Sequence, residues 1–278
     1  MTWFVLSILS GLLFALARAI SRVYLKKQGN ALAFTAIHDF IAGLVLLPII
    51  FIGFHWPTKA ITWLYFAGIV VFAFLSDWLA FIALKKIDIS TYQIVSQVRH
   101  FFVLISGLFL FSEVIVMNKL LAISLIIVGV IVSLYRKTKI DWNKGIGLTI
   151  LSTLSAVIAF AFAKFAVRDF SEIMVASLEL MLIGLLSFSL MKFDIRSLSK
   201  EFKINKWGLI LAGLFFGLFE MFLFYALKIG EISKVIPVTQ SSLVFGVLIG
   251  IIFMGEKKNL IRKIIGMLII VGGIILLN

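Results

Sequence analysis

Ten apolar runs, each bounded by charged or polar residues, dominate this sequence. They cover residues 2–25, 31–52, 60–84, 90–111, 119–135, 145–167, 171–191, 207–227, 232–254 and 263–277. A helix needs about 20 apolar residues to cross a bilayer. Eight of the runs reach that length, and the fifth and tenth are shorter. The pattern predicts an all-α membrane protein with ten transmembrane helices.

The composition supports this prediction. Hydrophobic residues make up 62% of the 278 positions, and 13 acidic side chains are too few to cover a soluble surface. The net charge of +13 does not indicate a nucleic-acid partner, because the Lys and Arg residues lie mostly in short loops between apolar runs. We expect no nucleic acid, and a lipid bilayer as the surroundings. The absence of cysteine excludes disulfides and thiolate metal sites.

An internal repeat organises the chain. Residues 76–134 align with residues 219–277 without a gap at an offset of 143, with 18 identities in 59 positions. Several identities are polar: Lys85 with Lys228, Ser90 with Ser233, Gln97 with Gln240 and Glu113 with Glu256. We predict two five-helix repeats, residues 1–138 and 139–278. Because five is odd, the second repeat enters the membrane inverted, and the two would surround a central cavity.

Charged residues inside the predicted spans are the main site candidates. In "FLSDWLAFIAL", residues 74–84, Asp77 aligns with Glu220, and a looser alignment pairs Asp39 with Glu179. A charge at the bilayer centre costs about 2.5–3.5 kcal/mol, so such groups face an interior or a watery cavity. Two interpretations of Asp77 and Glu220 stay open: structural partners of buried arginines, or groups that bind substrate or carry a proton. The basic groups without a counterpart in the other repeat, expected to confer specificity, are Arg18, Arg99 and His100.

Other polar positions have weaker signals. Gln93, Ser96, Gln97 and His100 share one face of the fourth span, which indicates either helix packing or a cavity wall. Gln240 is the repeat equivalent of Gln97. Pro237 cannot donate a main-chain hydrogen bond, which predicts a helix break or gate in the ninth span. Basic side chains near span ends are expected to reach the headgroups, and acidic ones to anchor loop ends: Arg22, Lys164, Glu113 and Glu256.

The second repeat resembles a known domain. "FYALKIGEISKVIPVTQSSLVFGVLIGIIFMGE" followed by "IIGMLIIVGGIIL" is similar to the EamA-type domain of the drug/metabolite transporter superfamily, and "FIALKKIDIS" to "LIIVGVIVSL" resembles a second copy. The resemblance implies a cavity lined by helices 1–4 and 6–9, peripheral helices 5 and 10, and transport of amino acids, other metabolites, sugar-nucleotides or drugs, often outward. The first copy departs from the pattern at Ile94, where the second has Pro237, and at the pair Arg99–His100.

Two transport functions follow as hypotheses. The first is export of amino acids or similar small polar metabolites by alternating access, with coupling to protons. Arginines would bind a substrate carboxylate, and Asp77 or Glu220 an amino group or a proton. The second is a carrier of anionic sugar phosphates or sugar-nucleotides that uses the same arginines. A structural or lipid-scrambling protein is a further alternative. We expect no enzyme, catalytic residue, metal or cofactor, because HExxH, GxGD-like aspartate and Ser–His patterns are missing from the sequence.

The location follows from the spans, and the orientation stays open. We expect a multi-pass protein of the cell (plasma) membrane, as a monomer or homodimer. Loops after odd-numbered helices carry seventeen Lys and Arg residues, and loops after even-numbered helices carry five. The positive-inside rule then places both termini outside, whereas the family resemblance places both inside.

Overall fold

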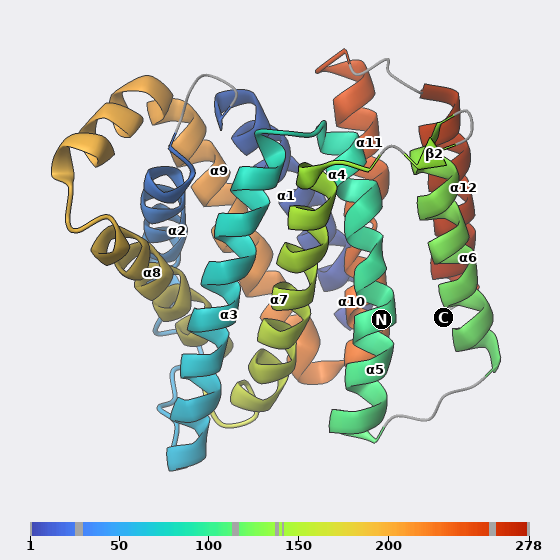
Figure 1. Cartoon of the computed structure of the whole chain (residues 1–278). Coiled ribbons are helices and arrows are strands. Elements are labelled where there is room, and N and C mark those ends of the chain that lie inside the picture. Colours follow the sequence, from blue (N-terminus) through green and yellow to red (C-terminus); the bar gives the residue numbers. More distant parts are fainter. Residues whose placement is uncertain are drawn as a thin grey trace.

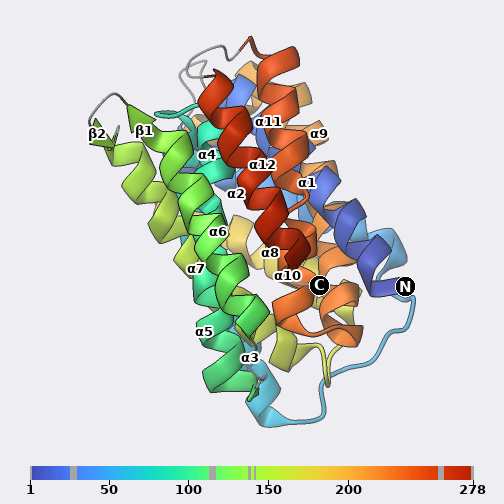
Figure 2. The same ribbon diagram turned by 90° about the vertical axis from the view of Figure 1, so that its right-hand side faces the viewer.

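The chain folds into a bundle of helices joined mostly by short loops, seen from two sides in Figures 1 and 2. The computed structural model describes residues 2–25, 30–112, 117–136, 139–140, 142–255 and 260–276. The expected roles of Glu113 and Glu256 lie outside these residues. The helices are α1 (Thr2–Leu25), α2 (Ala31–Leu46), α3 (Ala60–Leu84), α4 (Ile89–Val95), α5 (Arg99–Phe111), α6 (Met117–Leu134), α7 (Lys144–Ala166), α8 (Glu172–Leu190), α9 (Ile195–Ile229), α10 (Ile232–Thr239), α11 (Ser242–Ile252) and α12 (Leu260–Leu276).

Short elements complete the described chain. The 3₁₀ segments η1 (Leu47–Ile49) and η2 (Ser96–Val98) follow α2 and α4, and the two-residue strands β1 (Tyr135–Arg136) and β2 (Lys139–Ile140) pair antiparallel. Eight helical segments of the described residues are long and apolar enough to cross a membrane, counting α4–α5 and α10–α11 as one segment each. The predicted class, an all-helical multi-pass membrane protein, is therefore confirmed. Helices α6 and α12 pack against each other at one edge of the bundle, at the right of Figure 1.

The two predicted repeats interlock. Helix α1 of the first half packs along α9 of the second half. The repeat equivalents of these two helices are α7 and α3, and they also pack along each other. The remaining equivalent helices pack against each other, α2 on α8 and α6 on α12. Because neither half packs mainly on itself, the largest apolar core cluster draws on helices of both halves, with Phe14 from the first and Phe216 from the second. A cavity at the centre is then walled by both halves.

The fourth and ninth spans are both broken, and at equivalent places. Helix α5 begins at Arg99 and α11 begins at Ser242, 143 positions later. The break after α10 matches the prediction from Pro237. The break after α4 was not predicted, because Ile94 occupies the equivalent position. Its physical cause is local: the Ser96 hydroxyl and the Gln97 amide both donate to the Gln93 carbonyl, at 2.9 and 2.8 Å. Such side-chain bonds compete with the helical ladder.

The segment 192–206 is the longest stretch between two of the apolar runs, where the sequence predicts a loop, but it is largely helical. Helix α9 starts at Ile195, and the Asp194 carboxylate caps it by accepting hydrogen bonds from the main-chain N–H groups of Arg196 and Ser197. These bonds and one from the Ser197 hydroxyl lower the pKa of Asp194. The helix bends at Asn205, where φ is −123° and ψ is 15°. The charged residues of this segment favoured a loop in the sequence, but a charged helix with a capped first turn is also stable at a membrane surface.

The prediction that Arg22 reaches the headgroups is wrong, and Lys164 makes main-chain contacts that were not predicted. The Arg22 guanidinium is 97% buried and donates to the Leu84 carbonyl at the end of α3. The Lys164 ammonium donates to the carbonyls of Leu227 and Gly230, at 3.2 and 2.6 Å, at the end of α9. The last carbonyls of a helix lack intrahelical partners and carry partial negative charge, so they attract a cation more closely than the headgroup region does.

Candidate substrate site

A narrow polar cavity lies at the centre of the bundle. Its walls come from α1, α3, α7, α8, α9 and the broken fourth span, and it contains five of the predicted site residues: Arg18, Asp77, Arg99, Glu179 and Glu220. All five are 2–6% exposed. The cavity volume is about 30 Å³, which is room for about two water molecules at 10–15 Å³ each. Any metabolite that binds here requires the walls to separate.

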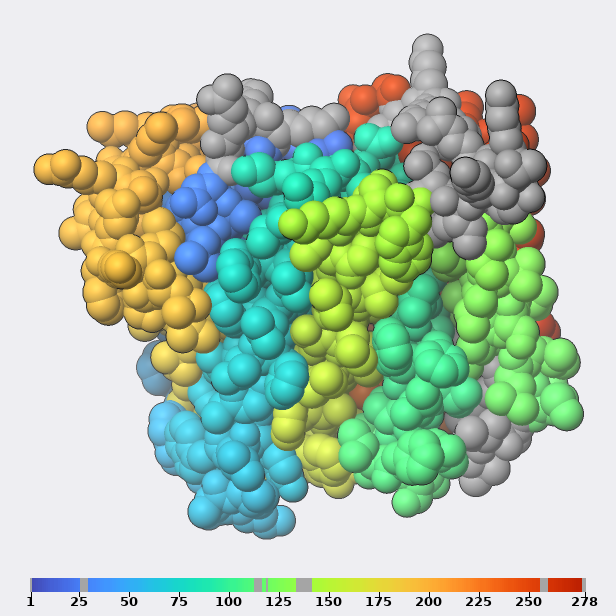
Figure 3. Space-filling model, in the orientation of Figure 1, coloured from blue at the N-terminus to red at the C-terminus, as the bar shows by residue number. Residues whose placement is uncertain are grey.

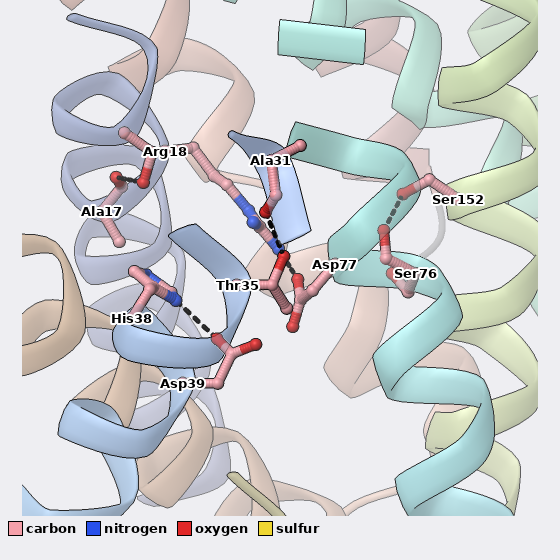
Figure 4. A network of polar contacts seen from close by, with 10 residues as sticks. Ala17, Arg18, Ala31, Thr35, His38, Asp39, Ser76, Asp77 and Ser152 are labelled. Atoms are coloured by element: carbon pink, nitrogen blue, oxygen red, sulfur yellow. Dashed lines mark hydrogen bonds and ion pairs between the residues drawn. The ribbon is translucent and has the colours of Figure 1, made fainter. Parts of the chain in front are cut away.

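Arg18 is held by an ion pair and by three aromatic rings. Its Nη2 group donates to Asp77 Oδ1, so α1 and α3 are joined inside the membrane (Figure 4). The guanidinium carbon lies 4.8–5.1 Å from the ring centroids of Phe14, Phe81 and Phe216, a favourable position for a cation. Nε and Nη1 have no hydrogen-bond partner among the described residues. The arginine is thus fixed in place with donors left over.

Arg99 is the second buried cation, and its surroundings differ. Its Nε group donates to the Ser96 carbonyl at 3.2 Å, within the helix break, and its guanidinium carbon lies 5.9 Å from the Phe14 ring. Among the described residues, no carboxylate lies within ion-pair distance of it. A buried charge without a counter-charge is costly. The Arg99 guanidinium is therefore available to pair with an anionic group that enters the cavity.

Three further acids surround the ion pair. Glu179 on α8 and Glu220 on α9 line the cavity, and the Oε2 atom of each has no hydrogen-bond partner among the described residues. Both interact electrostatically with Asp77 and Asp39. Asp39 lies behind them, outside the cavity lining, with Oδ1 2.5 Å from His38 Nδ1 (Figure 4). The cavity thus presents two carboxyl groups with open acceptor positions.

Four predicted residues lie outside the cavity lining, at the helix breaks. The Gln97 amide donates to Gln240 Oε1 at 3.3 Å, and His100 Nε2 lies 3.2 Å from Gln97 Oε1. Pro237 lies within α10, before the second break. Gly11 of α1 packs so closely here that a Cβ atom would collide with the Thr239 carbonyl. These residues join the two broken spans and α1.

Several lining residues were missed by the sequence analysis as site candidates. Ser76, Ser152 and Thr153 line the cavity, and the Ser152 hydroxyl donates to the Ser76 carbonyl at 2.8 Å, which joins α3 to α7 (Figure 4). Tyr92 lines it from α4. The available signals were weak: Ser76 precedes Asp77, and "LSTLS" places three small polar residues in an apolar run. Such residues are common in helix contacts.

The chain is similar to a named bacterial protein and to a solved structure. A protein of Listeria monocytogenes serovar 1/2a (strain ATCC BAA-679 / EGD-e), "Putative sugar uptake protein lmo0169", is 28% identical over 181 residues. The match covers 60% of this chain and 61% of that protein, so the chain spans about three fifths of the relative's length. A solved structure described as "Crystal structure of protein" has the same fold, with a TM-score of 0.66 and 14% identity over 97% of this chain and 95% of that one.

The family assignment rests on a match that covers nearly the whole chain. The sequence profile of the EamA-like transporter family, which is part of the drug/metabolite transporter superfamily, matches it twice, over residues 1–135 and 143–278. The description of the family names its members as transporters. The chain belongs to the EamA-like transporter family.

Proposed function

We propose that this protein is a secondary transporter that exports amino acids or similar small zwitterionic metabolites through the central cavity. One observation carries the proposal: a buried arginine and two buried carboxyl groups face one small space with unused hydrogen-bonding capacity. Arg99 has no carboxylate partner among the described residues, and Glu179 and Glu220 each keep one Oε2 atom unpaired. A substrate carboxylate bound to Arg99 and a substrate ammonium bound between the two glutamates would supply the partners that these side chains lack.

The proposed mechanism is alternating access of two inverted repeats, residues 1–138 and 139–278. Two features support it. Equivalent helices exchange packing partners between the halves, and the α-helix of the fourth span and that of the ninth span are interrupted at equivalent positions. Interruptions of this kind often mark hinges. At the end where α3 meets α4, Asp88 lies 3.6 Å from Arg22 and 3.8 Å from Lys263, which connects the halves. Opening that end would separate these charges.

A sugar or sugar phosphate is the second candidate substrate. The Listeria relative carries a sugar-uptake name, and carboxylates such as Glu179 and Glu220 accept hydrogen bonds from hydroxyl groups. Among the lining residues are six aromatic rings, including Phe160 and Phe224, which can pack against the apolar face of a sugar ring. A phosphate would use Arg99 and the two free donors of Arg18 instead.

A ligand screen by thermal stabilisation tests the substrate class. A ligand that binds only the folded protein stabilises it by RT ln(1 + [L]/Kd), about 2.7 kcal/mol at 100 Kd. The panel holds amino acids, neutral sugars and sugar phosphates. We expect stabilisation by an amino acid that is lost in both Glu220→Gln and Arg99→Gln. The control variants Lys206→Gln and Glu231→Gln change exposed charges and should keep the effect.

Other outcomes of the screen decide between the candidates. If a neutral sugar stabilises the protein and still stabilises Arg99→Gln, the substrate is a sugar and not a zwitterion. Stabilisation by phosphates alone, lost in Arg99→Gln but kept in Glu220→Gln, would indicate the anion carrier. Stabilisation that none of the cavity variants changes would refute the site.

Flux into liposomes tests direction and coupling. Reconstituted protein should move the stabilising ligand faster under an imposed pH gradient, and Glu220→Gln, which no longer binds the ligand, should show no flux with or without the gradient. Transport that is indifferent to the gradient in the unmodified protein would remove protons from the mechanism. The sidedness of uptake under the gradient gives the direction.

A further inference from the structure

We propose that an apolar groove on the outer side of α7 binds a phospholipid, with one acyl chain along the groove and its phosphate on Arg168. The groove lies between α3, α5 and α7 on the face shown in Figure 3 and has a volume of about 410 Å³. This volume is within the usual range for ligand sites. None of the described residues that line the groove also lines the central cavity, because α7 turns opposite faces to the two spaces.

The dimensions of the groove match one leaflet of a bilayer. Along α7 it extends from Leu154 to Phe165, a distance of about 16 Å at 1.5 Å per residue. The hydrocarbon core is about 30 Å thick, so one leaflet is about 15 Å. An acyl chain that reaches across one leaflet therefore covers about the length of the groove.

The walls exclude a polar ligand. They are aliphatic and aromatic except for Tyr65 and Ser106. The Ser106 hydroxyl donates to the Val103 carbonyl within α5, at 2.8 Å, so its hydrogen is already used. A sugar or an amino acid would lose its hydrogen bonds to water here without replacement. An acyl chain loses none.

A cation stands at one end of the groove. The Arg168 guanidinium carbon lies 5.3 Å from the ring centroid of Phe165, the last groove residue of α7. Arg168 is exposed, and no carboxylate of the described residues lies within ion-pair distance of it. The neighbouring Asp169 is engaged elsewhere, since it accepts hydrogen bonds from Thr58 and Lys59. Arg168 follows the end of α7 at Ala166, where a lipid phosphate would lie, and a guanidinium binds phosphate through two parallel bonds.

Native mass spectrometry of the purified chain in mild detergent tests the proposal. The probes are palmitoyl-oleoyl phosphatidylglycerol and the diacylglycerol with the same chains. Ser106→Trp fills the groove and Arg168→Gln removes the cation. Ser124→Trp is the matched control, because Ser124 is an exposed residue of α6 whose hydroxyl also bonds within its own helix. Lys206→Gln controls for the loss of one exposed charge. Thermal melting within a few degrees of the unmodified protein confirms that each variant folds.

The expected results distinguish the contact of the acyl chain from the contact of the lipid phosphate. The unmodified protein and both controls should retain one phosphatidylglycerol. Arg168→Gln should weaken retention about fivefold, the equivalent of about 1 kcal/mol for one basic group at a lipid surface, and leave diacylglycerol unchanged. Ser106→Trp should weaken both lipids at least about tenfold, because the indole takes the place of the chain.

Three results would overturn the proposal. Equal retention in Ser106→Trp and Ser124→Trp would show that the chain does not occupy the groove. An equal effect of Arg168→Gln on both lipids would remove the phosphate contact. A dimer mass that Ser106→Trp alone abolishes would assign the groove to a second copy of the chain. Because the readout is lipid mass, the result is independent of the proposed substrate.

Discussion

The ion pair between Arg18 and Asp77 can be tested by a double-mutant cycle. Arg18→Met keeps a long side chain among Phe14, Phe81 and Phe216 but leaves Asp77 unpaired, and Asp77→Asn keeps the shape of the acid but leaves the arginine charge unpaired. Both groups are under 5% exposed. Removing one partner of a buried pair costs about 3–5 kcal/mol. Each single variant should lose that much free energy of unfolding.

The double variant carries no charge at either position, so its stability should lie close to that of the unmodified protein. Neutral replacement of a whole buried pair is often without cost. The coupling energy, which is the sum of the two single losses less that of the double variant, would then be about 6–10 kcal/mol, above the range of about 0.5–3 kcal/mol that is usual for residues in contact. The assay is unfolding in mixed micelles with increasing dodecyl sulfate, followed by circular dichroism. Additive effects, with a coupling energy below about 0.5 kcal/mol, would refute the pairing.

Three further predictions concern other parts of the fold. Gly11→Ala should destabilise the protein by about 1–3 kcal/mol, because a Cβ collides with the Thr239 carbonyl, whereas Gly147→Ala, with open space around it, should be neutral or stabilising in the same unfolding assay. Asp88→Asn should raise the rate at which a thiol reagent modifies Ser76→Cys in the cavity, because it removes the partner of Arg22 and Lys263; an unchanged rate would contradict a role in closing that end. Hydrogen bonds from the Lys59 N–H and from Thr58 and Thr62 lower the pKa of Asp169 to about 2, from 3.8. Because the folded pKa is the lower one, this stabilisation is complete above pH 3.8 and disappears as the pH falls toward 2. A melting curve against pH should therefore be flatter for Asp169→Asn in that interval, and identical slopes would contradict it.

The location of the charged site could be predicted from the sequence, but its pairing could not. Asp77 and Glu220 line one cavity with Arg18, as expected when charges inside spans avoid lipid. The sequence places a residue at a depth along its helix, but it does not say which helices are neighbours. The choice of Asp77 over Glu220 as the partner of Arg18 depends on how α1 sits between α3 and α9.

The two main errors have related physical causes. The break after α4 depends on two side chains that bond the Gln93 carbonyl, whereas the hydroxyls of Ser21 and Ser187 each bond a carbonyl of their own helix without breaking it. The helical start of α9 was hidden by its charges, which are compatible with both a loop and a helix at the interface. In both places a few local hydrogen bonds decide between alternatives of nearly equal sequence propensity.

The contact between Gln97 and Gln240 suggests how such a protein can arise. In the proposed arrangement of two inverted repeats, residues at equivalent positions touch only near the axis that relates the repeats, as in a symmetric homodimer, where a residue on the axis meets its own copy. A side chain in that position must be able to bond to itself. Two lysines or two glutamates would repel each other there, whereas an amide carries both a donor and an acceptor. Glutamine at this point is therefore what a gene duplication could inherit unchanged from two separate, identical chains.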